Sequence, residues 1–346
     1  MSTVYVTEQR SVVRREGEVL LIQIPEDRER GMAKREVEVQ LIKIDRVVVL
    51  GNVTFTAPAL AMLLEERIDV CFLTEHGRFL GHLAPELSKN GPLRIAQHAA
   101  AADEERAVGL ARLFIVGKLS NMRTLLLRSN RKLADEAVAA GIAGVRQAQL
   151  GLSLATDVAH LMGYEGAGTA AYFGCFDRLL RHGWTFPGRH KRPPTDPVNA
   201  LLSFGYVVLT NAVASAIKTV GLDPTIGFLH QARYGKPSLA LDLVEEFRPL
   251  VVDSSVLTVL NNRMVQPSGF SYELGVCQMD SATRRAWLAA LEERLDTAIE
   301  HPVFGYKATY RRCLELQARL LSKYLSGEIE AYRVGGAGAA QVAGAD

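Results

Sequence analysis

The spacing of apolar residues changes once along this chain, near residue 93. Before that point, segments rich in β-branched residues alternate apolar with polar positions, as in residues 19–24, 37–44, 46–50, 68–73 and 78–81. After it, apolar residues recur every three or four positions in long segments. The first pattern is typical of strands and the second of amphipathic helices. We therefore expect an α+β protein, with a small N-terminal β-sandwich-like domain followed by a larger all-α C-terminal domain.

The same patterns predict where the domains and helices lie. A chain of 346 residues is long enough for roughly two domains. We expect a β-rich domain over residues 1–84 with one short helix at 58–66, a turn-rich linker at 85–92, an α-helical domain over 93–332, and a flexible Gly/Ala tail at 333–346 with nothing to bury. The expected long helices cover residues 106–128, 132–140, 145–161, 170–180, 199–220, 239–247, 283–299 and 304–325.

The composition argues against several classes of protein. No apolar run approaches the roughly 18 residues that a membrane span needs, and the N-terminus lacks the pattern of a signal peptide. The 4 cysteines are scattered and form no C-x-x-C pair, which argues against a disulfide framework or a zinc knuckle. We expect a cytoplasmic protein with no membrane partner. The formal net charge of +2 does not indicate whether the partner is a polyanion.

Two segments concentrate positive charge. No acidic residue occurs between Ala107 and Ala134, where Lys118 and Arg123 are among six basic residues. A solvated helix face is the simpler interpretation of that segment. The second segment, residues 178–192, also lacks acids and mixes aromatic with basic side chains, which suits phosphate contacts and base stacking. The residues we expect to contact nucleic acid are Arg178, Arg181, Trp184, Arg189, Lys191 and Arg192, with Lys118 and Arg123.

Further along the chain, an imidazole is followed by a cluster of carboxylates. His230 ends the sequence Gly-Phe-Leu-His, and Asp242, Glu245 and Glu246 share one face of the next expected helix. Taken alone, His230 is better explained as an ordinary core or turn histidine, and the acidic residues as the solvent face of an amphipathic helix. Helical geometry alone does not decide whether Glu245 or Glu246 turns inward.

Glu165 is isolated in the glycine-rich run Gly-Tyr-Glu-Gly-Ala-Gly, residues 163–168, which we expect to start a helix. Glycines there leave room for a phosphate backbone to approach. If Glu165 joins His230 and the acidic cluster in space, the carboxylates and the imidazole suit Mg²⁺ or Mn²⁺, whereas zinc more often takes thiolates or several histidines. Such an ion would polarise a phosphate and activate a hydroxyl.

Three segments in order resemble a known family. They are Tyr164-Glu165-Gly166 followed by Ala171-Tyr172-Phe173, residues 188–206 (GRHKRPPTDPVNALLSFGY), and residues 227–230 (GFLH) with 235–249 (GKPSLALDLVEEFRP). Together they resemble the CRISPR-associated endonuclease/integrase family, the first-numbered CRISPR-associated proteins, over nearly the whole chain. Three long motifs in order are specific, although any one tetrapeptide would not be.

The resemblance implies a function and a set of site residues. Glu165, His230 and Glu245 would be the Mg²⁺ or Mn²⁺ ligands, and Asp242 an accessory acidic residue of the catalytic site. This register selects Glu245 over Glu246. The implied activity is a metal-dependent DNA endonuclease and integrase, a hydrolase of phosphodiester bonds that serves antiviral defence by inserting short DNA spacers at CRISPR repeats through transesterification.

The resemblance also implies partners. They are DNA, as spacer precursor and CRISPR repeat, a second copy of the chain joined through the β domains, and a small ferredoxin-like companion adaptation protein. The main rival interpretation is a DNA-binding architectural subunit with a degenerate metal site. Two less favoured interpretations are a related transposon integrase, which usually carries a helix-turn-helix domain, and a metal phosphoesterase that acts on small molecules.

Overall fold

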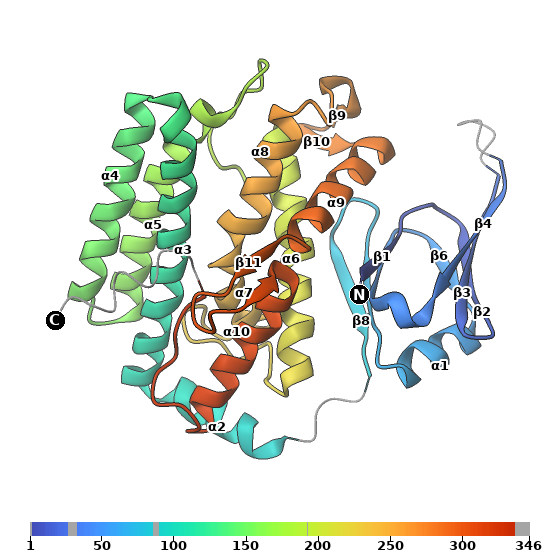
Figure 1. Cartoon of the computed structure of the whole chain (residues 1–346), viewed down its shortest axis with the longest axis horizontal. Coiled ribbons are helices and arrows are strands. Elements are labelled where there is room, and N and C mark those ends of the chain that lie inside the picture. Colours follow the sequence, from blue (N-terminus) through green and yellow to red (C-terminus); the bar gives the residue numbers. More distant parts are fainter. Residues whose placement is uncertain (1, 27–32, 86–89, 192, 336–346) are drawn as a thin grey trace. The chain divides into compact units, whose positions relative to one another are not determined.

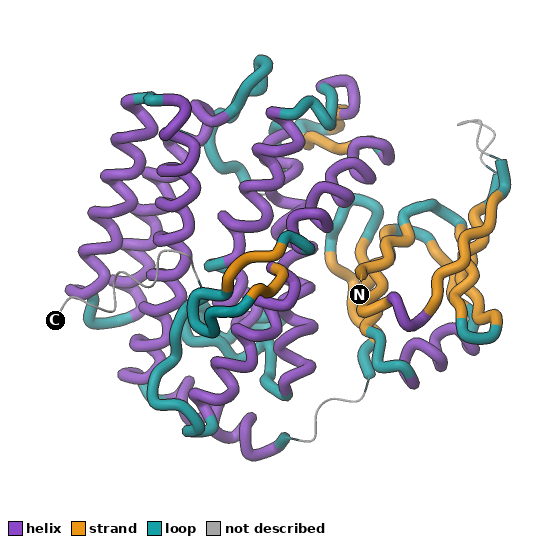
Figure 2. Tube along the Cα trace, viewed as in Figure 1, coloured by secondary structure: helices purple, strands orange, loops and turns teal. Residues whose placement is uncertain are grey.

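The computed structural model describes residues 2–26, 33–85, 90–191 and 193–335. The chain forms two compact units, Met1–Leu87 and Ser88–Asp346 (Figure 1). The division between them falls inside the segment predicted as a linker, 85–92. Figure 2 shows that most strands belong to the first unit and nearly all helices to the second. The expected α+β class, with N-terminal sheets and a helical C-terminal region, is confirmed.

The first unit contains two four-stranded sheets. One has the order β1-β5-β7-β8 and the other the order β4-β3-β2-β6. In the first sheet β1, β5 and β7 run parallel and β8 is antiparallel to β7. The strands of the two sheets are β1 (Ser2–Val6), β5 (Ile44–Leu50), β7 (Asp69–Leu73) and β8 (Phe79–Leu83), then β4 (Arg35–Gln40), β3 (Val19–Ile24), β2 (Ser11–Glu16) and β6 (Val53–Phe55).

A single apolar core joins the two sheets of this unit. Val13 and Leu20 from one sheet share it with Val47 and Val70 from the other, and Leu63 enters from the short helix α1 (Ala57–Glu65). This is the sandwich-like arrangement that the alternating pattern predicts. Strands β1, β2 and β6 were not predicted, and the expected strand at 37–44 is divided by a 3₁₀ turn, Leu41–Lys43.

The second unit is built mainly from helices. They are α2 (Gly91–Ala102), α3 (Glu104–Leu133), α4 (Glu136–Gly151), α5 (Val158–Gly174), α6 (Pro197–Val220), α7 (Ser238–Val244), α8 (Ser254–Asn261), α9 (Ser281–Leu295) and α10 (Tyr310–Leu325). A π-helical turn, Arg248–Asp253, joins the α7 region to α8, and 3₁₀ turns cover Leu152–Leu154, Phe176–Leu179 and Pro267–Gly269. Helices α3, α4 and α5 lie side by side (Figure 1).

Aspartates start the long helices. Asp103, Asp135, Asp157 and Asp196 precede α3, α4, α5 and α6, and each side chain accepts a hydrogen bond from a backbone N–H three residues on. These bonds satisfy donors that a helix start otherwise leaves unpaired. The capping aspartates therefore explain where α4 and α5 begin. The helices predicted over 132–140, 145–161 and 170–180 nevertheless have the wrong bounds.

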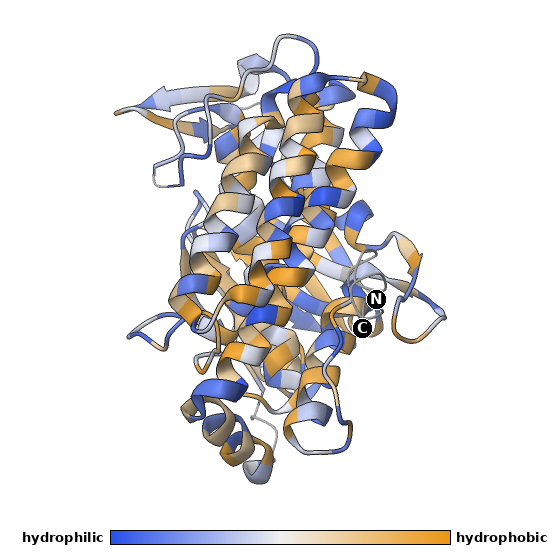
Figure 3. Ribbon diagram, turned by 90° about the vertical axis from the view of Figure 1, so that its left-hand side faces the viewer, coloured by the Kyte–Doolittle hydropathy of each residue, from blue (hydrophilic) through white to orange (hydrophobic). Residues whose placement is uncertain are grey.

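Helix α6 is largely enclosed by the other helices. By length and composition it is the one helix among the described residues that would suffice to cross a membrane, contrary to our expectation that no run is long enough. However, 61% of the relevant window is buried inside the protein. Other helices are amphipathic, and Figure 3 shows apolar and polar residues interleaved along those that face the viewer. Burial within its own domain therefore accounts for the apolar character of α6.

Three local features of the second unit differ from the predictions. The domain is not all-α, because two small antiparallel sheets are present, β9 (Phe270–Glu273) with β10 (Val276–Met279) and β11 (Ala298–Glu300) with β12 (Lys307–Thr309). Glu165 lies in the middle of α5 and not at a helix start. The tail predicted from residue 333 is packed at first, since Val334 is buried. The rest of the predicted tail, from residue 336, lies outside the described residues.

Close packing around Gly205 in α6 gives a test of this core. A Cβ atom at Gly205 would lie 2.7 Å from Val252 Cγ1 and 2.8 Å from Trp287 Cζ2, both too close. We expect Gly205→Ala to lower the free energy of unfolding by about 1–3 kcal/mol. The matched control is Gly109→Ala in α3, where nothing lies within 4 Å and a gain of about 0.5–1 kcal/mol is expected. Urea unfolding of both variants measures the difference, and equal stabilities would contradict this account of the core.

Candidate metal centre

Two of the predicted site carboxylates meet at one buried cation. The Lys118 ammonium of α3 contacts Glu165 Oε1 from α5 and lies 2.7 Å from Glu245 Oε2, just after α7. Thr169, one turn along α5, donates a 2.9 Å hydrogen bond to the same Glu165 oxygen. Lys118 and Glu245 are only 5% and 4% exposed. Three helices thus bring Glu165 and Glu245 to a common point, although 80 residues separate them in the sequence.

Positive charge keeps this site ionised. Burial by itself raises the pKa of Glu245, but the charges of Arg248 and Lys118 outweigh it and lower that pKa to about 2. Arg248 Nη1 lies 2.7 Å from Glu245 Oε1. Burial lowers the pKa of Lys118, but Glu245 and Glu165 outweigh burial, and the net shift is upward. Lys191 also lies near this site. Burial lowers the pKa of Lys191 most, and the charges of Lys118 and Arg248 lower it further. The site therefore contains the buried Glu245 carboxylate and the partly exposed Glu165 carboxylate, with the cations of Lys118, Arg248 and Lys191 nearby.

His230 is held in one orientation by Asp242. Asp242 Oδ1 lies 2.7 Å from His230 Nδ1 and accepts a 2.9 Å bond from the His230 backbone N–H. Its Oδ2 accepts bonds of 2.6 and 3.0 Å from the backbone of Phe228 and Leu229. The His230 ring is 28% exposed, and no described residue bonds its Nε2. A carboxylate on Nδ1 leaves Nε2 as the lone-pair donor, the arrangement that orients metal-binding histidines.

Glu245 and Glu246 both turn inward, toward different partners. Glu246 packs against Gly117, the residue before Lys118, and its Oε2 accepts a 3.1 Å bond from the Gly335 backbone N–H. Burial raises the pKa of Glu246 to about 8, so this carboxyl is mostly protonated at neutral pH. The acidic face of α7 is therefore not a solvent face, as the simpler interpretation had it. Only Glu245 of the two touches the Lys118 cation.

Helix α3 and the π-helical turn explain this arrangement. Asn121, one turn after Lys118, donates a 2.8 Å hydrogen bond to the Glu246 backbone carbonyl. Regular α-helix stops at Val244, and the π-helical turn begins at Arg248. Such turns shift the direction of side chains by a fraction of a turn and are frequent at functional sites. At this interruption two successive glutamates both turn inward, Glu245 toward Lys118 and Glu246 toward Gly117 of α3.

Another buried acid, Asp253, lies in the same helical unit. Asp253 accepts hydrogen bonds from the hydroxyls of Tyr172, at 2.8 Å, and Tyr206, at 2.5 Å. The guanidinium carbons of Arg248 and Arg189 lie 4.9 and 5.4 Å from the Tyr206 ring centroid. Burial raises the pKa of Asp253 to about 6, although both tyrosine hydrogen bonds oppose the rise. This cluster lies beside Arg248, which separately contacts Glu245.

The pKa of Asp253 predicts a pH dependence of stability. Because the folded state binds this proton more tightly than the unfolded chain, the free energy of unfolding falls as pH rises from about 4 to 6. Asp253→Asn removes the titration while keeping a group that both tyrosines can bond. Between pH 4.5 and 7.5 we expect the variant to gain about 2 kcal/mol relative to the wild type. Urea unfolding at several pH values measures this, and parallel pH profiles would contradict it.

The predicted nucleic-acid contacts are dispersed. Lys118 is buried in the acidic site and is not a surface contact, and Arg123 is half-buried. Arg189 bonds Asn199 Oδ1 at 2.6 Å and Ser203 Oγ at 3.0 Å, so it serves the local packing. Trp184 packs edge-on against Phe270.

The remaining predicted contacts are more accessible. Arg178 lies 3.6 Å from Asp135 at the surface, and Arg181 is exposed. Lys191 lies near enough to the acidic site for the charges of Lys118 and Arg248 to lower its pKa. Arg192 lies outside the described residues.

The donor set fits Mg²⁺ or Mn²⁺ in its chemistry. The carboxylates of Glu165 and Glu245 and the imidazole of His230, whose Nδ1 is bonded to Asp242, are ligands that these ions accept. Among the described residues, no three His, Cys, Asp or Glu side chains converge closely enough to hold an ion as they stand. Instead, the Lys118 ammonium provides the positive charge between Glu165 and Glu245. The two glutamates thus already converge on a cationic position beside His230.

Several residues of the site were not predicted for it. Sequence reasoning assigned Lys118 to a DNA-facing surface and did not single out Arg248, Asn121 or Asp253. A signal for Lys118 existed, because an apolar helix with a lysine and an asparagine one turn apart is a poor candidate for full exposure. The partner of that lysine depends on how α3 packs against α5 and α7, which local sequence does not reveal.

Comparison with known proteins reveals extended similarity. The family model of the CRISPR associated protein Cas1 matches residues 4–293. A CRISPR-associated endonuclease Cas1 of Thermus thermophilus is 37% identical over 334 residues, covering 96% of each chain. A Cas4/Cas1 fusion of Geobacter sulfurreducens, named as an exonuclease and endonuclease, is 41% identical over 95% of this chain. The chain spans only 59% of that fusion's length.

Solved structures share the fold. A casposase bound to integration product superposes with a TM-score of 0.85 at 22% identity, covering 96% of this chain and 93% of the casposase. At that identity the likeness concerns the fold alone. The family model and the 37% identical relative from Thermus thermophilus cover nearly the whole chain. This chain belongs to the Cas1 family of CRISPR-associated proteins.

Proposed function

We propose that this protein is a divalent-metal-dependent DNA endonuclease and integrase of CRISPR adaptation, which inserts short DNA spacers at CRISPR repeats. The observation that carries the proposal is the convergence of Glu165 and Glu245 on one buried cationic position. His230 adds an oriented imidazole, and Asp242 holds it. Family membership and the endonuclease names of relatives that are 37–41% identical support the same activity.

The proposed reaction is a transesterification. The 3′-hydroxyl of a captured DNA attacks the phosphodiester at the edge of a repeat and loses its proton as a new P–O bond forms. The bond from that phosphorus to the 3′-oxygen of the flanking nucleotide breaks, and this oxygen leaves and takes up a proton. Glu165, His230 and Glu245 would hold Mg²⁺ or Mn²⁺, which supplies polarisation of the phosphate and activation of the attacking hydroxyl. In hydrolytic cleavage, water takes the place of the hydroxyl.

The chain's own residues have distinct roles in this proposal. Asp242 fixes the His230 ring so that Nε2 is the donor atom. Lys118 holds Glu165 and Glu245 close together. With an ion held by these carboxylates, the Lys118 ammonium would no longer be needed between them. Its ammonium, on a flexible four-carbon chain, is thereby placed to contact a DNA phosphate. Arg248 stays with Glu245 and limits repulsion between the carboxylates.

The proposed partners follow from the family. We propose that two copies pair through their β domains and that a small ferredoxin-like companion adaptation protein bridges two such dimers. Lys191, beside the acidic site, and the exposed Arg178 and Arg181 are proposed DNA contacts. Because these contacts neutralise phosphates, binding should weaken steeply as salt rises.

A joining assay on a supercoiled repeat plasmid tests the proposal. With Mg²⁺ or Mn²⁺ and the companion protein, the wild type should nick and join, whereas Glu165→Gln and His230→Ala should lose joining while still binding DNA. The control is Glu136→Gln, an exposed glutamate of α4 that should join normally. Unchanged joining by Glu165→Gln would instead support an architectural DNA-binding subunit with a degenerate site.

A further inference from the structure

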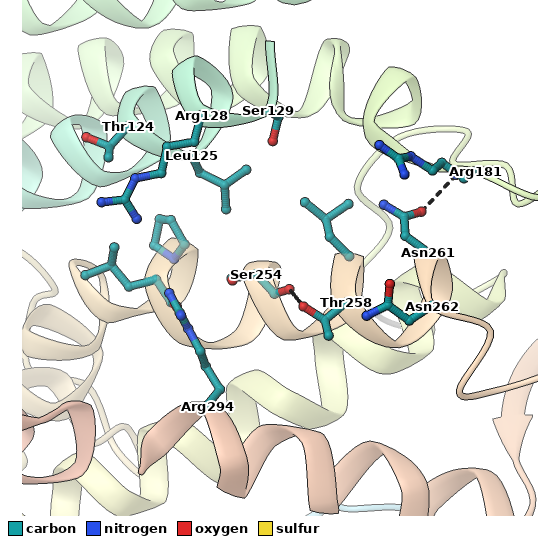
Figure 4. Close-up of a pocket in the computed structure, with 13 residues that line it drawn as sticks. Thr124, Leu125, Arg128, Ser129, Arg181, Ser254, Thr258, Asn261, Asn262 and Arg294 are labelled. Atoms are coloured by element: carbon teal, nitrogen blue, oxygen red, sulfur yellow. Dashed lines mark hydrogen bonds between the residues drawn. The ribbon is translucent and has the colours of Figure 1, made fainter. Parts of the chain in front are cut away.

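A second cationic site lies in the helical unit, outside the acidic site. It is a cavity of about 310 Å³ between α3, the π-helical turn with α8, and α9 (Figure 4). Three arginines line it: Arg128 from α3, Arg181 from the segment after α5, and Arg294 from α9. None of the 13 described lining residues is acidic. The cavity therefore concentrates positive charge without a countercharge of its own.

The arginines have few internal partners. No described carboxylate forms an ion pair with the guanidinium of Arg128 or Arg181, both of which are exposed. Arg294 donates a 2.7 Å bond to the Leu250 carbonyl and lies against the Tyr310 ring, so neither partner neutralises its charge. Burial lowers the pKa of Arg294, and the nearby positive charge of Arg128 adds to this effect. Cations gathered in this way are stabilised by an anion from outside the chain.

The remaining lining suits a phosphate. Hydroxyl and amide side chains surround the cavity: Thr124, Ser129, Ser254, Thr258, Asn261 and Asn262. Figure 4 shows Arg128 and Arg294 toward one end and Arg181 with Asn261 toward the other. Guanidinium groups from the two ends of the cavity, together with the hydroxyl groups of its wall, would donate hydrogen bonds to phosphate oxygens from two directions. The volume is at the lower end of the range for small-ligand sites, so it admits one nucleotide unit and not a large ligand.

The cavity shares two elements with the acidic site. Leu125, in its wall, is seven residues after Lys118 on α3, which places it on the same helix face about 10 Å further along. The opposite wall begins with Pro249 and Leu250, four and five residues after Glu245. Phosphates follow one another at roughly 3.4 Å along a stacked strand, and at wider spacing when the strand is extended. Arg128, which contributes to the cavity, is ten residues after Lys118, or about 15 Å further along α3. Two to four nucleotides therefore span the interval from the acidic site to this arginine.

We propose that this cavity binds a backbone phosphate of the DNA strand whose reacting bond lies in the acidic site, two to four nucleotides away. The proposal rests on the proposed function and adds a second anchor, which would fix how far the strand advances past Glu165 and Glu245. Arg128 and Arg181 supply the contacts, and Arg294 supplies charge from the inner wall.

DNA strands that carry a single uncharged methylphosphonate linkage test the proposal. A series of strands is compared, each with the linkage at a different position. In the wild type, one position two to four nucleotides from the reacting end should weaken DNA binding and single-turnover joining about tenfold, and the other positions should have less effect. Arg128→Gln/Arg181→Gln should show a similar loss with unmodified DNA and no further loss at that position. The slope of its DNA affinity against salt concentration should fall by about one phosphate contact, because the cavity binds one phosphate.

The control removes equal charge from the same helix. Arg131→Gln/Lys132→Gln changes two exposed residues in the last turn of α3 that do not line the cavity, and it should keep the position-specific effect. An effect of the linkage that persists in Arg128→Gln/Arg181→Gln, or no positional effect in the wild type, would overturn the proposal. Binding of inorganic phosphate or a free nucleotide with no positional effect in DNA would also overturn it, in favour of a site for free anions.

Failure of this inference is distinguishable from failure of the proposed function. Glu165→Gln should lose joining but retain the positional effect on binding. If the wild type neither nicks nor joins DNA with Mg²⁺ or Mn²⁺, the proposed function fails, and the binding profile still reports on the cavity. If joining depends on Glu165 while the positional effect is absent, only the cavity assignment fails.

Discussion

Replacing Lys118 by methionine is expected to destabilise the metal-free protein by about 3 kcal/mol, because the buried Glu245 and the partly buried Glu165 then lose the cation that they share. Arg248 still neutralises part of the charge, which keeps the loss near the lower end of the range for broken buried ion pairs. The melting temperature should fall by roughly 5–10 °C. Thermal unfolding in a chelating buffer measures this effect.

The same variant should respond more strongly to metal. In the wild type an ion must displace the Lys118 ammonium from Glu165 and Glu245, whereas in Lys118→Met it meets two unshielded carboxylates. Added Mn²⁺ should therefore raise the melting temperature of the variant more than that of the wild type. Lys132→Met, at the exposed end of α3, is the control and should change neither value. A smaller response to Mn²⁺ in Lys118→Met would contradict the role assigned to Lys118.

Asp242→Asn should cause the second large loss. The carboxylate is fully buried and accepts four hydrogen bonds, three from backbone N–H groups and one from His230 Nδ1. An asparagine would turn its NH₂ group toward donors that cannot accept, at a cost of about 2–3 kcal/mol in stability. The ring of His230 would also lose its fixed orientation. We expect metal affinity or strand joining to fall about 10–100-fold.

Asp253→Asn is the matched control for that substitution. Asp253 is also fully buried, but its partners are the hydroxyls of Tyr172 and Tyr206, which can accept as well as donate. The control should therefore retain joining and gain relative stability above pH 6. ¹⁵N spectra of the His230 ring would show whether the tautomer changes in Asp242→Asn. Similar losses of joining in both variants would indicate a general effect of asparagine in the core, contrary to our assignment.

The change in apolar spacing near residue 93 predicted the two kinds of architecture well. Alternation predicted β3 and β7, and three- and four-residue spacing predicted α6 and α9, because burial on one face leaves a period in the sequence. The short sheets β9-β10 and β11-β12 lacked that signal. Their strands have only three or four residues, too few for a period to be recognised.

The site was predictable only in part. The ordered motifs named Glu165, His230, Asp242 and Glu245 as site residues, and the structure brings the first and last together and pairs the middle two. Helical geometry failed at Glu245 and Glu246, because the helix is interrupted there and both side chains turn inward.

The environment of the site was harder to predict than its acids. A buried lysine between two glutamates depends on the packing of helices that are distant in sequence. Lys118 was therefore taken as a surface contact, although it is central to the acidic site. The environment of Glu246 depends likewise on distant packing, because burial raises its pKa to about 8, while a hydrogen bond from Gly335, 89 residues further along the chain, acts in the opposite direction.

The central claim is that Glu165, His230 and Glu245 bind one divalent ion that is needed to act on DNA. Titration calorimetry with Mn²⁺, followed by joining assays on the same samples, tests this claim. The test compares variants of two adjacent glutamates, Glu245→Gln and Glu246→Gln, with the wild type. The wild type and Glu246→Gln should bind one Mn²⁺ per chain at this site and join DNA, whereas Glu245→Gln should lose both. Joining in the presence of a chelator, or equal behaviour of Glu245→Gln and Glu246→Gln, would contradict the account.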